Sequence, residues 1–155
     1  MKRIYLLSFL VLSGCDTNDS SSSILMNGQM FVGQYNSLSI KEPLSLRFIY
    51  QADKTLGIND LSLVFSQGIN NAVCVDKATV EINGGHVNPI STKTYTDDGL
   101  RKLSFKMKYS FDQGLNFGLA KNISVSICDQ QYMLSNEDLK GIKKVFSQWA
   151  NFIAE

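Results

Sequence analysis

The stretch from Leu103 to Phe111, which reads LSFKMKYSF, decides the fold. Its apolar side chains occupy every second position, and serine or lysine occupies the positions between them. Side chains of a β-strand alternate between two faces, so this pattern places the apolar groups on one face and the polar groups on the other. The stretch therefore predicts a strand in a sheet with one buried and one solvated face.

Shorter alternations of the same period occur elsewhere, and each predicts a further strand. They are found at residues 44–50, 61–65, 73–82 and 123–128, the third with an irregularity near Asp76. Residues 86–96 make a poorer strand, because Pro89 cannot donate a backbone hydrogen bond to a neighbour. We expect that segment at a sheet edge or in a bulge.

Turn residues separate these segments. Asn83-Gly84 and Asp98-Gly99 favour tight hairpins, since both dipeptides accept the positive φ angles of primed turns. Residues 112–116 are expected to form a longer loop. The second half of the chain is therefore predicted to be an antiparallel meander.

The period changes after the last predicted strand. Apolar residues recur at helical spacing from Leu139 to Ile153, and Ser135 with Asp138 fits a capping box. A helix over 136–154 would be about 28 Å long and could cover a small sheet. Docking of this helix on a partner or on the bilayer is the alternative.

Gly141 lies inside this predicted helix. Glycine there costs about 1 kcal/mol relative to alanine. We interpret its presence as a sign that the helix approaches a strand closely.

Composition fits one compact domain. The chain has 155 residues, is 44% hydrophobic and contains 2 prolines, which is typical of a globular protein. Its 15 basic residues barely exceed its 14 acidic residues, so nucleic acid is not an expected partner. We expect a single α+β domain over 28–155, mainly an antiparallel β-sheet or β-sandwich with the C-terminal helix packed on it.

The first fifteen residues form a targeting signal. Lys2 and Arg3 precede an apolar run at 4–12, which is too short to span a bilayer because a spanning helix needs about 20 residues. The residues from Leu12 to Cys15, LSGC, resemble the lipobox of bacterial lipoprotein precursors. The resemblance implies that the signal peptide 1–14 is removed and that Cys15 is lipidated. An uncleaved N-terminal anchor is the alternative.

Lipidation of Cys15 would hold the protein on the bacterial envelope, facing the periplasm. Residues 15–27 are predicted to be a flexible tether with a reach of about 20 Å. Asp16 resembles the signal that keeps enterobacterial lipoproteins in the inner membrane, so the inner membrane is slightly favoured over the outer; otherwise Asp16 is only part of the tether. Cleavage removes Lys2 and Arg3, which leaves a mature chain with a charge of about −1.

Two cysteines remain after Cys15. Cys74 and Cys128 are expected to form a disulfide in an oxidising envelope. Both fall out of phase with the apolar residues beside them, so they could meet on the face opposite the main core. Two buried free thiols are the alternative. Redox catalysis is not expected, because no Cys-x-x-Cys motif is present.

Sequence motifs for catalysis are absent. His86 is the only histidine, so no histidine pair can bind zinc, and we expect His86 to be a solvated turn residue. Asp97 and Asp98 are adjacent, but turn formation explains them. The chain contains no HExxH, GxSxG or GxxxxGK pattern. We therefore expect neither an enzyme nor a metal or cofactor site.

A small basic cluster is the one surface feature with a distinct character. It consists of Arg101, Lys102, Lys106 and Lys108, of which the three lysines share a strand face. In a chain of charge near −1 this cluster suits an acidic partner. The alternative is that the lysines protect an edge strand from pairing with other chains.

An anchored, β-rich domain without a catalytic motif is best suited to binding a protein. Small lipoproteins of this make-up resemble inhibitor or immunity proteins that bind a periplasm-acting toxin or hydrolase. They also resemble accessory lipoproteins of secretion or pilus assembly machines. We favour the first, because a compact domain on a short tether needs no further interaction segment. An enzyme acting on envelope polymers is the third hypothesis.

Overall fold

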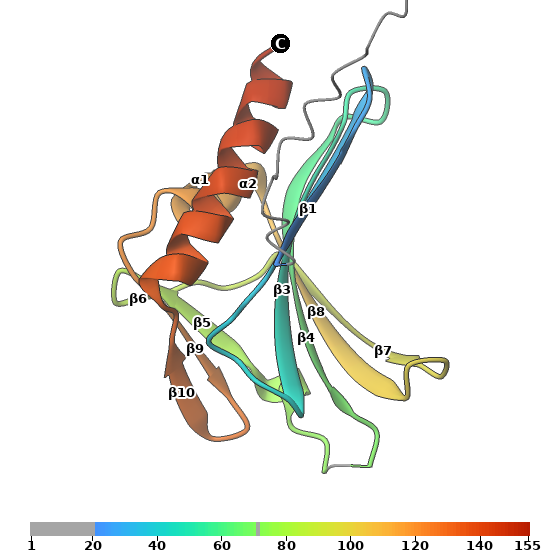
Figure 1. The fold of residues 1–155 in the computed structure, drawn as a ribbon, viewed down its shortest axis with the longest axis vertical. Coiled ribbons are helices and arrows are strands. Elements are labelled where there is room, and N and C mark those ends of the chain that lie inside the picture. The colour runs from blue at the N-terminus through green and yellow to red at the C-terminus, as the bar shows by residue number, and fades with distance from the viewer. Residues whose placement is uncertain (1–20, 71) are drawn as a thin grey trace, which may run out of the picture.

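The computed structural model describes residues 21–70 and 72–155. The predicted signal peptide and Cys15 lie outside the described residues. In the described chain the strands form two antiparallel sheets, and a long C-terminal helix packs against the larger one (Figure 1). The α+β prediction is confirmed.

The larger sheet has the strand order β1-β2-β3-β4-β8-β7. Its strands are β1 (Ser22–Met26), β2 (Met30–Asn36), β3 (Leu44–Asp53), β4 (Ile58–Gly68), β7 (Ser91–Asp97) and β8 (Lys102–Tyr109). The smaller sheet has the order β10-β9-β5-β6. Its strands are β5 (Thr79–Ile82), β6 (Gly85–His86), β9 (Ile123–Ile127) and β10 (Gln130–Met133). The helices of the described chain are η1 (Val75–Lys77, a 3-10 turn), α1 (Phe111–Gly118) and α2 (Asn136–Ala154).

The strand predicted from LSFKMKYSF is β8, and it lies between β4 and β7. Phe105, Met107 and Tyr109 are buried in the core, whereas Lys106 and Lys108 point to the other face. The strand ends at Tyr109 because Ser110 caps a helix: its hydroxyl accepts from the backbone N–H of Gln113 at 3.3 Å. The loop predicted at 112–116 is therefore wrong, and those residues belong to α1. The Ser-x-x-Gln spacing of a capping box was the signal for this helix.

The predicted meander is also wrong. β5 pairs with β9, and both belong to the smaller sheet, whereas β7 and β8 lie in the larger one. The second half of the chain thus moves from one sheet to the other and back. Period-2 patterning fixes which face of a strand is buried, but it does not identify the strand's neighbour.

Two turn predictions have different outcomes. Asn83 and Gly84 take φ angles of 51° and 79°, as a primed turn between β5 and β6 requires. The hairpin between β7 and β8 is present, but its positive φ lies at Arg101 (49°) rather than in a tight Asp98-Gly99 turn. Strand β7 is one of the two edge strands of the larger sheet, as expected for the segment after Pro89.

The tether prediction fails for its last part. Residues 22–26 form β1, which pairs with β2 from Ser22 opposite Tyr35 to Met26 opposite Phe31. Ile24 is partly buried against the core, and this apolar contact offsets some of the entropy lost on ordering the segment. The ordered domain therefore begins before residue 28.

Helix α2 has the predicted bounds and lies across β2 and β3. Trp149 is fully buried in the interface, and its indole N–H donates to the backbone carbonyl of Gln51 at 3.0 Å. At Gly141 an added methyl group would overlap the ring of Tyr35. The close approach predicted for Gly141 is confirmed, and the helix contact with β2 depends on the missing side chain.

The carboxylate of Asp138 joins the start of α2 to the loop that follows β2. Asp138 is 0% exposed, and both of its oxygens accept hydrogen bonds. Oδ1 accepts from the Tyr35 hydroxyl at 2.9 Å and from the Leu38 N–H at 2.6 Å. Oδ2 accepts from the hydroxyls of Ser37 and Ser39 and from the backbone N–H groups of Ser39 and Ser135. The predicted capping box at Ser135 is part of this cluster.

The pKa of Asp138 reflects two opposing effects. Burial alone would raise it, because the charged form loses its water. The hydrogen bonds from Ser39, Leu38, Tyr35 and Ser135 outweigh burial, so the pKa lies below the ordinary value of 3.8. Because the folded state then holds the carboxylate deprotonated more strongly than the unfolded state, its contribution to stability is complete above about pH 4 and is lost as the pH falls toward the lowered pKa.

Replacing Asp138 with asparagine should destabilise the protein by about 2–3 kcal/mol, because an amide brings its own donors to a site that offers only donors. Urea unfolding at pH 7 measures the loss. The variant should also lose less stability than the wild type between pH 5 and the acid limit. Glu137→Gln removes one exposed carboxylate from the same helical turn and should cost under about 1 kcal/mol. Equal losses in the two variants would contradict the role given to Asp138.

Cys74 and Cys128 are joined in the structure, with their Cα atoms 4.9 Å apart. Cys74 directly precedes η1, and Cys128 follows β9 with a φ of 54°. Both are partly exposed at the side of the smaller sheet. The bond closes a separation of 54 residues that includes β7, β8 and α1.

Reduction of this bond should lower the free energy of unfolding by about 4 kcal/mol, the loop-entropy value for a closed loop of this length. Urea unfolding of the Cys15→Ser chain, with and without reductant, measures the change. In the Cys74→Ser/Cys128→Ser chain the reductant should have no effect. Two alkylated thiols in the Cys15→Ser chain without reductant would refute the bond.

Candidate functional site

The two faces of the larger sheet have different surroundings. α1, α2 and the smaller sheet all lie on one side of it (Figure 1). On the other side, which we call the outer face, no helix or strand of residues 21–70 or 72–155 covers the larger sheet. The outer face is therefore open to a partner over several adjacent strands.

Long basic side chains shield the centre of the outer face. Val64 is only 5% exposed although no element covers it. Lys106 lies directly opposite Val64 on β8, and Arg47 lies opposite it on β3. Side chains of directly paired residues point to the same face, so the alkyl stem of Lys106 flanks the valine on one side and that of Arg47 flanks it on the other. The Arg47 guanidinium then reaches toward β2 and donates to the side-chain oxygen of Gln34 at 3.5 Å.

One row of cross-strand pairs continues to the sheet edge, where Lys93 of β7 lies opposite Lys106. Basic residues thus occur on three of four successive strands along the row. Two more lysines on β8 flank it. We call this set the cationic face, and it consists of Arg47, Lys93, Lys102, Lys106 and Lys108.

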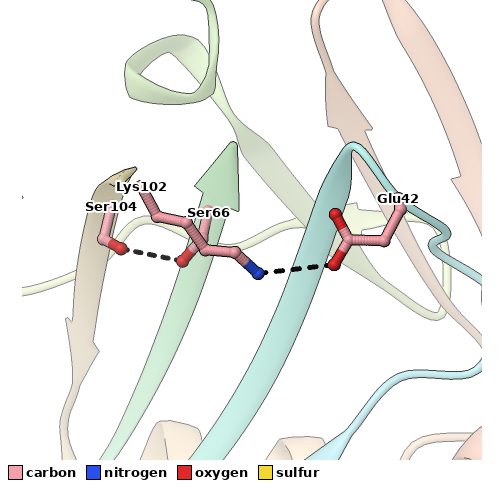
Figure 2. A network of polar contacts seen from close by, with 4 residues as sticks. All are labelled: Glu42, Ser66, Lys102 and Ser104. Carbon is pink, nitrogen blue, oxygen red and sulfur yellow. Dashed lines mark hydrogen bonds and ion pairs between the residues drawn. The ribbon is translucent and has the colours of Figure 1, made fainter. Parts of the chain in front are cut away.

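The first and last lysines of β8 have acidic partners. Lys108 lies 2.9 Å from Asp60. Lys102 lies 3.3 Å from Glu42, and Figure 2 shows this second pair. Beside the second pair the hydroxyls of Ser66 and Ser104 are 2.8 Å apart (Figure 2). These contacts neutralise the two ends of the β8 lysine series.

The middle of the cationic face has no such compensation. Within the described part of the chain, no acidic oxygen lies within 4.0 Å of the ammonium of Lys93 or Lys106. Like charges directly opposite on neighbouring strands destabilise a sheet. An anionic group placed over this pair would remove the repulsion, so the centre of the outer face is suited to a carboxylate from another molecule.

The predicted basic cluster is only partly the cluster that the structure forms. Lys102, Lys106 and Lys108 share the outer face as expected, but Arg101 lies in the hairpin turn. The edge-protection alternative is wrong for β8, because β4 and β7 flank it on both sides. Lys93 lies on the true edge strand, where a lysine also discourages pairing with another chain. Lys93 and Arg47 could not be assigned to this cluster from the sequence, because only the strand register places them in one row with Lys106.

A groove of about 470 Å³ lies next to the disulfide. It runs between the loop after β2 and strand β10, with Glu42 and Tyr132 among its lining residues. Gln67 forms part of its floor and is 1% exposed. The side-chain oxygen of Gln67 accepts from the backbone N–H groups of Cys74 and Val75. Its side-chain NH₂ donates to the backbone carbonyl of Ala72 at 2.8 Å. Because Glu42 also pairs with Lys102, the groove borders one end of the cationic face.

The groups with catalytic potential lie apart from one another: His86 is on the smaller sheet, and Asp97 lies opposite Lys102 at one end of the cationic face. His86 is exposed on β6, and Asp97 accepts from the N–H of Leu100 at 3.0 Å within the hairpin turn. Burial raises the pKa of the Tyr50 and Tyr109 hydroxyls well above the ordinary value of 10.0, so both stay protonated. Among the described residues, no group of three His, Cys, Asp or Glu side chains could hold a metal ion.

None of the helices at 21–70 and 72–155 is long and apolar enough to cross a membrane. Comparison with known protein families found no match, and neither did comparison with curated proteins or with solved structures.

Replacing Lys93 with glutamate should stabilise the isolated protein by about 0.5–1 kcal/mol at low salt, because the repulsion with Lys106 becomes an attraction. Thermal unfolding at low and high ionic strength measures the gain, which should shrink as salt rises. Lys93→Gln should produce roughly half of it. A destabilised Lys93→Glu protein would contradict the cross-strand repulsion.

Proposed function

We propose that this protein is a lipid-anchored protein of the bacterial envelope that binds the acidic surface of a protein partner and does no catalysis. The favoured role is that of an inhibitor or immunity lipoprotein for a toxin or hydrolase that acts in the periplasm. The single observation that carries the proposal is the open outer face with the uncompensated Lys93 and Lys106 at its centre.

A rigid surface suits tight recognition. The cationic face is formed by strands rather than by loops, so the backbone positions that carry its charges are held at fixed spacings by the ladder of β3, β4, β8 and β7. A fixed backbone loses little conformational entropy on binding, and the clustered charges increase the rate of association with an oppositely charged surface. A protein that must bind a toxin before the toxin damages its target benefits from both properties.

The anchor proposal depends on the lipobox resemblance at Cys15 and is consistent with the position of β1. Because β1 starts at Ser22, only seven residue steps separate it from Cys15. Even fully extended, these steps span at most about 25 Å. A lipidated Cys15 would therefore keep the domain close to the membrane surface, at a high local concentration for partners that cross or approach that membrane.

Gene neighbourhood separates the two binding roles. An inhibitor or immunity protein predicts an adjacent gene for an exported toxin or hydrolase and a one-to-one complex with its product. An accessory lipoprotein of a secretion or pilus machine predicts neighbouring genes for envelope machinery and co-purification with membrane subunits.

Reversing the charge of both central lysines should abolish partner binding. We expect Lys93→Glu/Lys106→Glu, purified with its partner from native membranes, to lose at least about tenfold in affinity, since each reversal turns an attraction into a repulsion. Quantitative co-purification and titration with the neighbouring gene product measure the loss. The matched control is Lys140→Glu/Lys143→Glu, which reverses two exposed lysines on α2 and should leave binding unchanged.

Two outcomes would contradict the proposal. Equal loss in the α2 control would show that only net charge matters, and unchanged binding in the double reversal would place the interface elsewhere. Cys15→Ser tests the anchor separately: it should prevent labelling with radioactive palmitate and release the folded protein from the membrane fraction.

A further inference from the structure

Four exposed apolar residues lie on two neighbouring hairpins at one end of the larger sheet, and the consecutive Leu25 and Met26 point to its opposite faces. Leu25, Met26 and Met30 come from the β1–β2 hairpin, and Leu56 comes from the loop between β3 and β4. Their exposed fractions are 74%, 60%, 42% and 71% respectively. The two turns lie side by side, since the N–H of Lys54 donates to the carbonyl of Gln29 at 2.9 Å. We call these four side chains and the two turns the apolar tip.

Four backbone N–H groups of the tip donate to side chains within the turns. The Asn27 side chain accepts from the N–H groups of Gln29 and Met30 at 2.9 and 2.8 Å. The Asp53 carboxylate accepts from the N–H groups of Thr55 and Leu56 at 2.8 and 3.0 Å. Entry into a low-dielectric layer is costly for an unpaired backbone donor. Internal capping of both turns lowers that cost while the apolar side chains project outward.

Charge at the tip neither drives nor forbids contact with lipid. Asp53 is 8% exposed and occupied in its turn. Lys54 lies with its ammonium 4.5 Å from the centre of the Phe152 ring. Glu155 follows α2 at the same end of the molecule (Figure 1). Because Lys54 and Glu155 carry opposite charges, attraction of the tip to a membrane would come from its apolar side chains.

The position of Cys15 in the chain brings the tip within reach of a bilayer. Strand β1 runs from Ser22 to Met26 and so spans about 17 Å toward the tip. The seven steps from Ser22 back to Cys15 span up to about 25 Å, which exceeds the length of β1. A lipid anchor at Cys15 can therefore lie level with the tip or beyond it.

We propose that the apolar tip is a second membrane contact, in which Leu25, Met26, Met30 and Leu56 enter the interfacial region of the bilayer that holds the lipid anchor. The inference depends on the proposed lipidation for its reach. A single point of attachment leaves a domain free to rotate, whereas two points fix its orientation. The larger sheet would then stand away from the membrane with the cationic face accessible along its side.

The test places a tryptophan at the tip. Met26→Trp is compared with Leu100→Trp, because Leu100 is 66% exposed but lies in the hairpin turn at the opposite end of the sheet. The length of β4, 11 residues, separates the two ends by about 35 Å. The native Trp149 is 0% exposed and gives a constant background. The probe is a vesicle of phosphatidylcholine with brominated acyl chains, which quench only a tryptophan that enters the bilayer.

The tether is supplied independently of lipidation. A hexahistidine tag replaces residues 1–15 and binds a nickel-chelating lipid, so that the folded domain is attached to the vesicle. We expect a blue shift and a loss of fluorescence for Met26→Trp that exceed those of Leu100→Trp, and a return to the Leu100→Trp level when Leu25, Met30 and Leu56 are changed to serine. Equal quenching of the two tryptophans overturns the membrane contact.

The outcomes separate this inference from the anchor proposal. Quenching at the tip of the tagged protein, together with a full-length chain that takes up no palmitate, leaves the tip contact standing and removes the anchor. Palmitate labelling without quenching at the tip keeps the anchor and overturns the tip contact. A blue shift that grows with protein concentration in the absence of vesicles would assign the tip to self-association and would also overturn the proposal.

Discussion

The packing of helix α2 against the larger sheet depends on the carboxylate of Asp138. This carboxylate accepts from the loop after β2, from Tyr35 inside β2 and from the backbone N–H of the Ser135 cap. One fully buried charge therefore fixes where α2 starts and how β2 ends. A buried charge without partners would oppose folding, but six donors from three parts of the chain satisfy this one. The position of α2 over β2 and β3 follows from that junction.

Elements marked by local signals could be predicted from the sequence. Helix α2 was predicted with its bounds because Ser135, Asp138 and the apolar spacing all agree, and β8 was predicted because its alternation is unbroken. The partition into two sheets could not be predicted. The pairing of β5 with β9 depends on contacts between segments about forty residues apart, and no local pattern records such a partner. Helix α1 was missed because two glycines in eight residues concealed a capped helix.

The candidate site shows the same limit. The lysines of β8 were visible in the sequence because they are two and four residues apart on one strand. Lys93 and Arg47 joined them only through the register of β7, β4 and β3. A charged surface on a sheet is formed by residues that lie side by side on neighbouring strands. Such residues are far apart in the sequence. Which of their charges are already neutralised depends on Asp60 and Glu42, which also come from other elements.

The crosslink between Cys74 and Cys128 has a consequence for the export to the envelope that we propose. The two cysteines flank the segment in which the chain crosses between sheets, and the bond is worth a large share of the 5–15 kcal/mol that a domain of this size typically has. In the reducing cytosol a newly made chain would lack that contribution and would remain only marginally folded. Such a chain is easier to thread through a translocation channel. Oxidation on the far side would then make the passage one-way, because the locked domain could not be unravelled and drawn back.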